Sequence, residues 1–150
     1  MVNIKARALI LKENKVFLLK THNYILPGGT LESWETITET FYREMLEETW
    51  VNAVIDRFLW FREYFNSKNE LSLEYIFLVK MLVILKIFLK KIVHTLMSGM
   101  RLDFQWIGVW KALINTFFDN YKDYNEIYLQ VAKYNIKNAI ADQNVLKFSV

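Results

Sequence analysis

Three glutamates, Glu44, Glu47 and Glu48, stand at positions i, i+3 and i+4 in a stretch without glycine or proline. On an α-helix this spacing places their carboxylates on one face, with Cβ atoms about 5–6 Å apart. Such like charges repel one another, and the neighbouring Arg43 offsets only part of the repulsion. A hard divalent cation, Mg²⁺ or Mn²⁺, prefers carboxylate oxygens and completes its coordination with water and substrate phosphates. The spacing predicts metal ligands, and a solvated helix face is the alternative.

A tight loop precedes these glutamates in the sequence. The segment Leu26-Pro27-Gly28-Gly29 contains the only proline and two of the 4 glycines of the chain. These residue types mark a position where the backbone bends sharply or approaches another group closely. A glycine loop beside a set of carboxylates suggests a metal-assisted phosphate site.

The spacing of the glycine and charged residues around this loop matches a known pattern. Gly29 is followed after five residues by Glu35 and, after seven more, by the segment Arg43–Val51. This arrangement resembles the Nudix box, G-x5-E-x7-R-E-U-x-E-E-x-G-U with U aliphatic, at every defined position except Trp50, where the family has glycine. Looser resemblance to Nudix hydrolases of the MutT type covers roughly two-thirds of the chain.

The resemblance implies an α/β fold, namely a Nudix-like α/β/α sandwich with a mixed β-sheet, as a single domain over residues 1–150. It implies hydrolysis of a pyrophosphate bond in a nucleoside diphosphate linked to another moiety, with water attacking phosphorus. The expected partners are this nucleotide derivative as substrate and, from the habit of the family, a second copy in a homodimer.

The resemblance also assigns roles to individual residues. Glu44, Glu47 and Glu48 would bind Mg²⁺ or Mn²⁺, and one of them would also activate water. The expected catalytic residues are Glu44, Glu47 and Arg43, with Arg43 orienting the glutamates by charge-assisted hydrogen bonds. The expected loop residues are Gly28, Gly29 and Glu35; the glycine permits the turn and the glutamate braces it.

Hydrophobic periodicity predicts the elements that must position these residues. Apolar residues at four-residue spacing predict a helix over Glu35–Thr49, and Thr36 with Glu39 forms a capping box near its start. Two β-rich pairs predict hairpins, Ile4–Leu11 with Val16–Lys20 around Asn14, and 53–65 with 71–85 around Asn66–Asn69. The remaining predictions are a strand over Leu102–Ile107, a helix over Val109–Phe118 and an added helix in the tail of about 121–150.

The sequence departs from the family pattern in two places. Trp50 replaces a glycine that often has a left-handed conformation, so we expect the helix exit to differ without moving Glu48. No acidic residue occurs from Tyr75 to Leu102, although many relatives place a carboxylate there. The nearest substitutes are Glu70, Glu74 and Asp103, and the sequence does not choose among them.

Composition excludes several other kinds of site. The chain has no cysteine and only 2 histidines, which excludes disulfides and thiolate metal sites and disfavours a histidine zinc site. A signal peptide pattern is absent, so a cytoplasmic location is expected. Four lysines interrupt the apolar stretch 75–100, which argues against a transmembrane helix: Lys80, Lys86, Lys90 and Lys91.

The net charge of +3 comes from 19 basic and 16 acidic residues, and the basic excess lies in one segment, 80–101. The simplest interpretation of Lys80–Lys91 is that its lysines protect an exposed strand edge from pairing with another chain. Contact with a membrane or nucleic acid and electrostatic steering of a phosphate substrate are the alternatives. Few aromatics are interleaved there, so nucleic acid binding is not indicated. Five aromatic residues are candidates for stacking on a base, although aromatics at such spacings are more often core residues: Tyr24, Trp34, Trp60, Phe61 and Trp106. A non-catalytic module that binds nucleotide, protein or membrane is the competing function.

Overall fold

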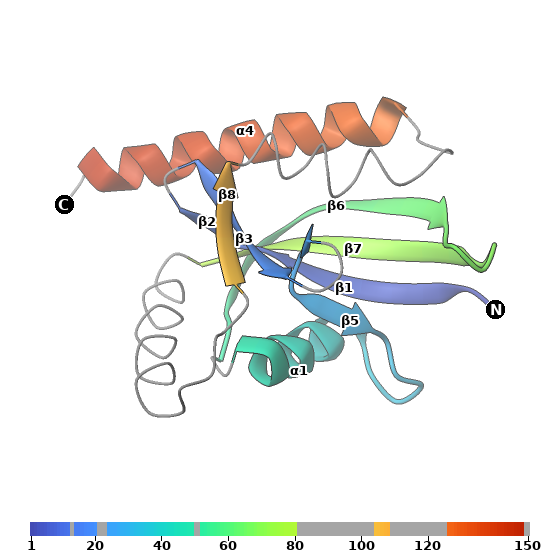
Figure 1. The fold of residues 1–150 in the computed structure, drawn as a ribbon. Helices are drawn as coiled ribbons and strands as arrows, with labels where there is room; N and C mark the ends of the chain where they lie inside the picture. The colour runs from blue at the N-terminus through green and yellow to red at the C-terminus, as the bar shows by residue number, and fades with distance from the viewer. Residues whose placement is uncertain (13, 21–23, 50–51, 81–103, 109–125, 149–150) are drawn as a thin grey trace.

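The structure is a computed structural model and describes residues 1–12, 14–20, 24–49, 52–80, 104–108 and 126–148. Its strands and helices follow one another as shown in Figure 1: β1 (Asn3–Leu9), β2 (Leu11–Lys12), β3 (Lys15–Lys20), β4 (Tyr24–Ile25), β5 (Gly28–Thr30), α1 (Ile37–Thr49), β6 (Ile55–Phe65), β7 (Leu71–Val79), β8 (Phe104–Gly108) and α4 (Glu126–Phe148). Predictions for Trp50, for segment 81–103 and for the helix over 109–118 concern residues outside these ranges.

Two β-sheets lie between α1 and α4, which are on opposite sides of the molecule (Figure 1). The larger sheet has the order β5-β1-β7-β6 and is mixed, because β1 and β7 are parallel while β5 and β6 pair antiparallel with their neighbours. In the smaller sheet, β3 pairs antiparallel with β2, β4 and β8. The expected α/β/α sandwich with a mixed sheet is confirmed.

Alternation of side chains along the strands produces two hydrophobic cores. Leu9 and Leu11 join the core on the α4 side, which includes Ala132 and Ile136 of that helix. Ala6, Ala8 and Ile10 alternate with them and point to the other face. There they join the core on the α1 side, which includes Phe41 and Met45 of that helix. Each helix is therefore fixed to one face of the sheet by its apolar stripe.

The two predicted turns use asparagine in a left-handed conformation, which asparagine tolerates better than most residues. Asn14 has φ 60° between β2 and β3, and Asn69 has φ 59° between β6 and β7. In the second turn the Asn66 side chain accepts hydrogen bonds from the amides of Lys68 and Glu70, at 2.9 and 3.0 Å. Both turns are therefore specified locally.

Helix α1 begins with the capping box that the sequence predicts. The Glu39 carboxylate accepts a hydrogen bond from the Thr36 amide at 2.7 Å, and the Thr36 hydroxyl accepts one from the Glu39 amide at 3.3 Å. The helix was expected from Glu35 but begins at Ile37, because Glu35 and Thr36 make contacts of the preceding loop and cap.

Replacing Thr36 with alanine removes this cap. We expect the free energy of unfolding to fall by about 1 kcal/mol, because an amide of the first helical turn loses its side-chain acceptor. Urea denaturation measures the change. Thr38→Ala is the control, because the Thr38 hydroxyl contacts the Thr36 hydroxyl but takes part in neither of the two amide hydrogen bonds of the capping box. Equal losses in the two variants would contradict a capping role for Thr36.

Within the described residues, α4 is the longest helix, with 23 residues. Neither it nor α1 is both long and apolar enough to cross a membrane.

Candidate functional site

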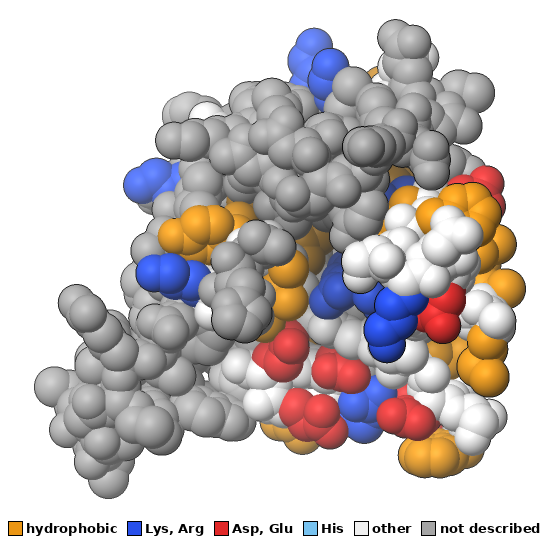
Figure 2. Space-filling model, turned by 45° about the vertical axis from the view of Figure 1, so that its right-hand side comes forward, with side chains coloured by type: hydrophobic (Ala, Val, Ile, Leu, Met, Phe, Trp, Pro, Cys, Tyr) orange, Lys and Arg blue, Asp and Glu red, His pale blue; other side chains and the backbone are white. Residues whose placement is uncertain are grey.

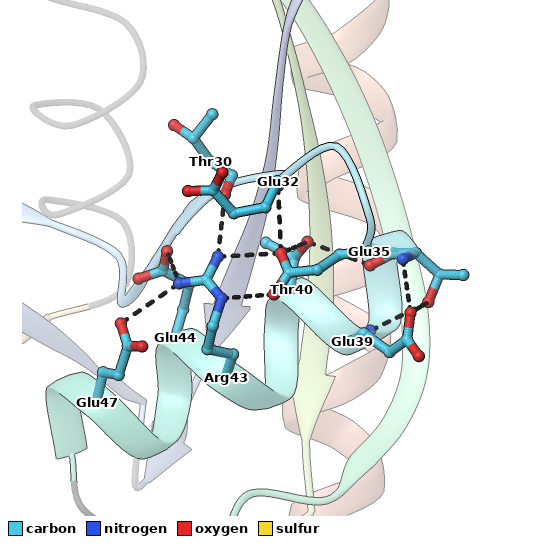
Figure 3. A network of polar contacts seen from close by, with 9 residues as sticks. Thr30, Glu32, Glu35, Glu39, Thr40, Arg43, Glu44 and Glu47 are labelled. Atoms are coloured by element: carbon cyan, nitrogen blue, oxygen red, sulfur yellow. Dashed lines mark hydrogen bonds and ion pairs between the residues drawn. The ribbon is translucent and has the colours of Figure 1, made fainter.

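The side chain of Arg43 lies at the centre of a polar network between α1 and the loop that precedes it (Figure 3). Its Nη1 donates to Glu44 at 2.8 Å and to Glu47 at 3.3 Å, and its Nη2 donates to the carbonyl oxygen of Thr30 at 3.1 Å. Its Nε and Nη2 bind the Glu35 carboxylate in a bidentate pair, at 2.5 and 3.1 Å. Arg43 therefore connects the two glutamates to the loop.

Glu35 braces the turn between loop and helix. Besides Arg43, it accepts hydrogen bonds from the Thr40 hydroxyl at 2.9 Å and from the Glu32 amide at 3.2 Å. The hydrogen bonds from Arg43, more than any other contact, lower the pKa of Glu35 to about 2 and raise that of Arg43. Both groups are therefore charged at neutral pH.

Glu48 extends from the same helix toward the glycine loop. Its Oε2 accepts a hydrogen bond from the Gly28 amide at 2.7 Å. Burial, with smaller contributions from the charges of Glu44 and Glu47, outweighs the Gly28 amide and Arg7 and raises the pKa of Glu48 to about 7. A partly buried carboxylate among other carboxylates is a position that a bound cation would stabilise.

Gly28 and Gly29 of the Leu26–Gly29 segment are the first residues of β5, and both lie very close to neighbouring atoms. Gly28 has φ +131°, and a Cβ there would lie within 3.0 Å of the carbonyl oxygen of Ala6 in β1. A Cβ on Gly29 would lie within 3.0 Å of the carboxylate of Glu44. The loop therefore packs directly against the helix that carries the glutamates, as a close backbone approach requires.

The raised pKa of Glu48 predicts how the metal-free protein responds to pH. The pKa of the Glu48 carboxyl is about 7 in the folded protein and near 4.5 in the unfolded chain. Its contribution to the free energy of unfolding is therefore complete below pH 4.5 and is lost as the pH rises through about 7. In the presence of EDTA, Glu48→Gln should therefore be more stable than the wild type at pH 8, by roughly 2 kcal/mol after allowance for solvent screening. The difference should shrink at pH 5. Urea denaturation at both pH values measures it, and a difference that does not depend on pH would contradict the assignment.

A second polar cluster lies behind the loop and was not predicted from the sequence. Arg7 of β1, Arg62 of β6 and Glu74 of β7 form ion pairs on one face of the larger sheet. The sequence carried a signal, because Glu74 lies in a mostly apolar strand, but only the parallel pairing of β1 with β7 makes Arg7 its neighbour. Glu74, one of the three substitutes for the missing downstream acid, therefore pairs with arginines.

The structure brings Gly28, Gly29 and Arg43 close to the glutamates of α1. Glu35 is joined to them through Arg43. Figure 2 shows acidic side chains gathered around a basic one on the lower part of the molecule, where α1 lies. Of Glu44, Glu47 and Glu48, Glu47 is the most exposed, with 59% of its side chain accessible. Within the described part of the chain, no three acidic or histidine side chains converge closely enough to form a complete metal site. Arg43 engages Glu44 and Glu47, and the Gly28 amide engages Glu48. Their oxygen donors nevertheless fit Mg²⁺ or Mn²⁺ chemically.

The aromatic residues considered for base stacking differ in their environment. Trp60 is a core residue at 4% exposure, whereas Trp34 is 78% exposed in the loop before α1. Phe61 is partly exposed and stacks on Tyr75 with ring centroids 6.0 Å apart. Tyr24 packs at the margin of the core on the α4 side.

Comparison with known proteins links this geometry to a family. The family model for the NUDIX domain matches residues 2–123. A comparison of the sequence with curated proteins gave no significant match.

Three solved structures are similar to this one over most of its length. A UDP-X diphosphatase aligns with a TM-score of 0.58 and 18% identity over 93% of this chain and 64% of that chain. A NUDIX hydrolase from Nitrosomonas europaea aligns with a TM-score of 0.56 and 18% identity over 89% and 87% of the two chains. A MutT protein from Methanosarcina mazei Go1 aligns with a TM-score of 0.56 and 16% identity over 92% and 95%. This chain spans 60% of the length of the E. coli ORF135 protein. At these identities the likeness shows the fold.

Proposed function

Because the chain belongs to the NUDIX family, we propose that it is a hydrolase that cleaves the pyrophosphate bond of a nucleoside diphosphate linked to another moiety, with Mg²⁺ or Mn²⁺ as cofactor. The observation that carries the proposal is the contact between Glu48 and the Gly28 amide, at 2.7 Å. It brings a carboxylate with a raised pKa together with a glycine loop able to approach a substrate phosphate.

In this proposal Glu44, Glu47 and Glu48 hold the metal. The metal, when bound, neutralises the phosphate oxygens and the leaving group. To bind the cation, the carboxylates of Glu44 and Glu47 would each have to give up a hydrogen bond from Arg43. Both carboxylates are at the ends of rotatable side chains. Exchange of this kind needs no movement of the helix backbone.

Other residues have supporting roles in the proposed reaction. Before the cation binds, Arg43 directs Glu44 and Glu47 to the same side of α1 through an ion pair with each. Glu35 holds Arg43 in that orientation through its bidentate pair. One of the metal-binding glutamates also removes a proton from the attacking water, which requires an ionised carboxylate within hydrogen-bond reach of it.

Product release from a panel of substrates tests this function. The panel contains ADP-ribose, UDP-glucose, a diadenosine polyphosphate and nucleoside triphosphates, each incubated with the protein in Mg²⁺, in Mn²⁺ and in EDTA. We expect cleavage of at least one compound between its phosphates, with the rate lost in EDTA. Binding of a nucleotide without any product in either metal would contradict the proposal and indicate a non-catalytic module.

A further inference from the structure

The glycine loop is held from behind by one arginine. Nη1 of Arg7, in β1, donates to the carbonyl oxygen of Leu26 at 3.2 Å and to that of Gly28 at 2.7 Å. The Arg7 side chain is only 13% exposed. A guanidinium is planar and rigid, so these two bonds fix the orientation of the two peptide groups relative to β1.

The peptide between Pro27 and Gly28 lies between those two carbonyl groups. Its oxygen accepts a hydrogen bond from the Ala8 amide at 2.8 Å, and its N–H donates to Glu48 at 2.7 Å. The flanking peptides are held by Arg7 and this one by the strand. The direction of the N–H toward Glu48 therefore depends directly on the strand and, through the two flanking peptides, on the Arg7 side chain.

Glu74 in turn fixes Arg7. The Glu74 side chain, 3% exposed, accepts a hydrogen bond from Arg7 at 3.2 Å, from Tyr64 at 3.0 Å and from Arg62 at 2.7 Å. Burial raises the pKa of Glu74, but the charges of Arg62 and Arg7 outweigh it and lower the pKa to about 2. Glu74 is therefore a permanent anion that holds Arg7 against the sheet.

We propose that Arg7 is a positioning residue for pyrophosphate hydrolysis: oriented by Glu74, it aligns the Gly28 peptide so that its N–H holds the Glu48 carboxylate in place. The inference rests on the proposed function for its effect on rate. Buried ion pairs add little net stability, whereas this one connects the centre of the sheet to Gly28, the first residue of β5, which has φ +131°.

Arg7→Lys and Arg62→Lys form a matched pair of variants. Both weaken a contact with Glu74, but only Arg7 also binds the loop carbonyls. Lysine keeps the charge and cannot bridge two carbonyls and a carboxylate in the same fixed geometry.

We expect Arg7→Lys to move the amide proton resonance of Gly28 upfield, because the hydrogen bond from this amide to the Glu48 carboxylate weakens. The same variant should lower kcat about 10- to 100-fold with little change in KM. Arg62→Lys should leave the Gly28 resonance and kcat near those of the wild type.

Two results would overturn the inference. One is an unchanged Gly28 resonance in Arg7→Lys, and the other is an equal shift in both variants, which indicates a merely structural ion pair. If Arg7→Lys does not fold, Tyr64→Phe is the second variant, because the Tyr64 hydroxyl shares Oε1 of Glu74 with Arg7, whereas Arg62 binds Oε2. Tyr64→Phe should give a smaller upfield shift, and no shift there also overturns the inference. Absence of turnover in the wild type would contradict the proposed function, while the Gly28 resonance still decides the role of Arg7.

Discussion

Glu48→Gln is expected to lower kcat for pyrophosphate cleavage by at least ~100-fold while the protein remains folded. Glutamine has nearly the same volume and retains an oxygen that accepts the hydrogen bond from the Gly28 amide. It lacks the negative charge that a divalent cation requires. The loss therefore reports the charge of Glu48 and not its packing.

Steady-state rates in Mg²⁺ measure this effect, with Glu70→Gln as the control. Glu70 is one of the three candidates for the missing downstream acid, but it lies in the turn between β6 and β7, where its carboxylate accepts a hydrogen bond from the Asn66 side chain. We therefore expect it not to take part in metal binding. Its replacement should leave kcat within about twofold of the wild type, as for most surface substitutions away from a site. A Glu48→Gln variant with a rate near that of the wild type would show that the chemistry does not depend on this glutamate.

Alanine at the two loop glycines should give opposite kinds of damage. At Gly28 the added Cβ meets backbone, the carbonyl oxygen of Ala6 in the central strand, and the residue has φ +131°. The strand cannot move aside cheaply, so we expect Gly28→Ala to lower the free energy of unfolding by at least ~3 kcal/mol.

At Gly29 the added Cβ meets the carboxylate of Glu44, which is the end of a flexible side chain. Gly29→Ala should therefore fold with nearly normal stability and still lose at least ~10-fold in kcat, because Glu44 is displaced. Thermal unfolding and steady-state kinetics on the two variants measure the contrast. Equal destabilisation of both, or full activity of Gly29→Ala, would contradict the packing described for this loop.

Most of the candidate site could be predicted from the sequence because its contacts are local. Arg43, Glu44, Glu47 and Glu48 lie within two turns of one helix, so helical spacing alone places them together. Glu35 is eight residues from Arg43, and the capping box defines where the helix begins between them. The family pattern added roles that spacing does not provide.

The contacts that could not be predicted join distant parts of the chain. Arg7 and Glu74 are 67 residues apart and meet because β1 and β7 are parallel neighbours. Likewise, Arg57 of β6 pairs with Asp142 of α4, and the Asn135 amide donates to the Leu59 carbonyl oxygen at 3.0 Å. Hydrophobic alternation predicts that a strand exists but leaves its neighbours in the sheet undetermined.

Direct titration with Mn²⁺, followed by electron paramagnetic resonance of the free ion, tests the claim that the α1 carboxylates form a divalent metal site. The wild type, Glu48→Gln and Glu70→Gln are compared at pH 8, where Glu48 is ionised. We predict saturable binding by the wild type and by Glu70→Gln, and an affinity at least ~10-fold weaker in Glu48→Gln. Binding that is equally strong in all three proteins, or that does not saturate in any of them, would contradict the assignment of the metal site to these glutamates.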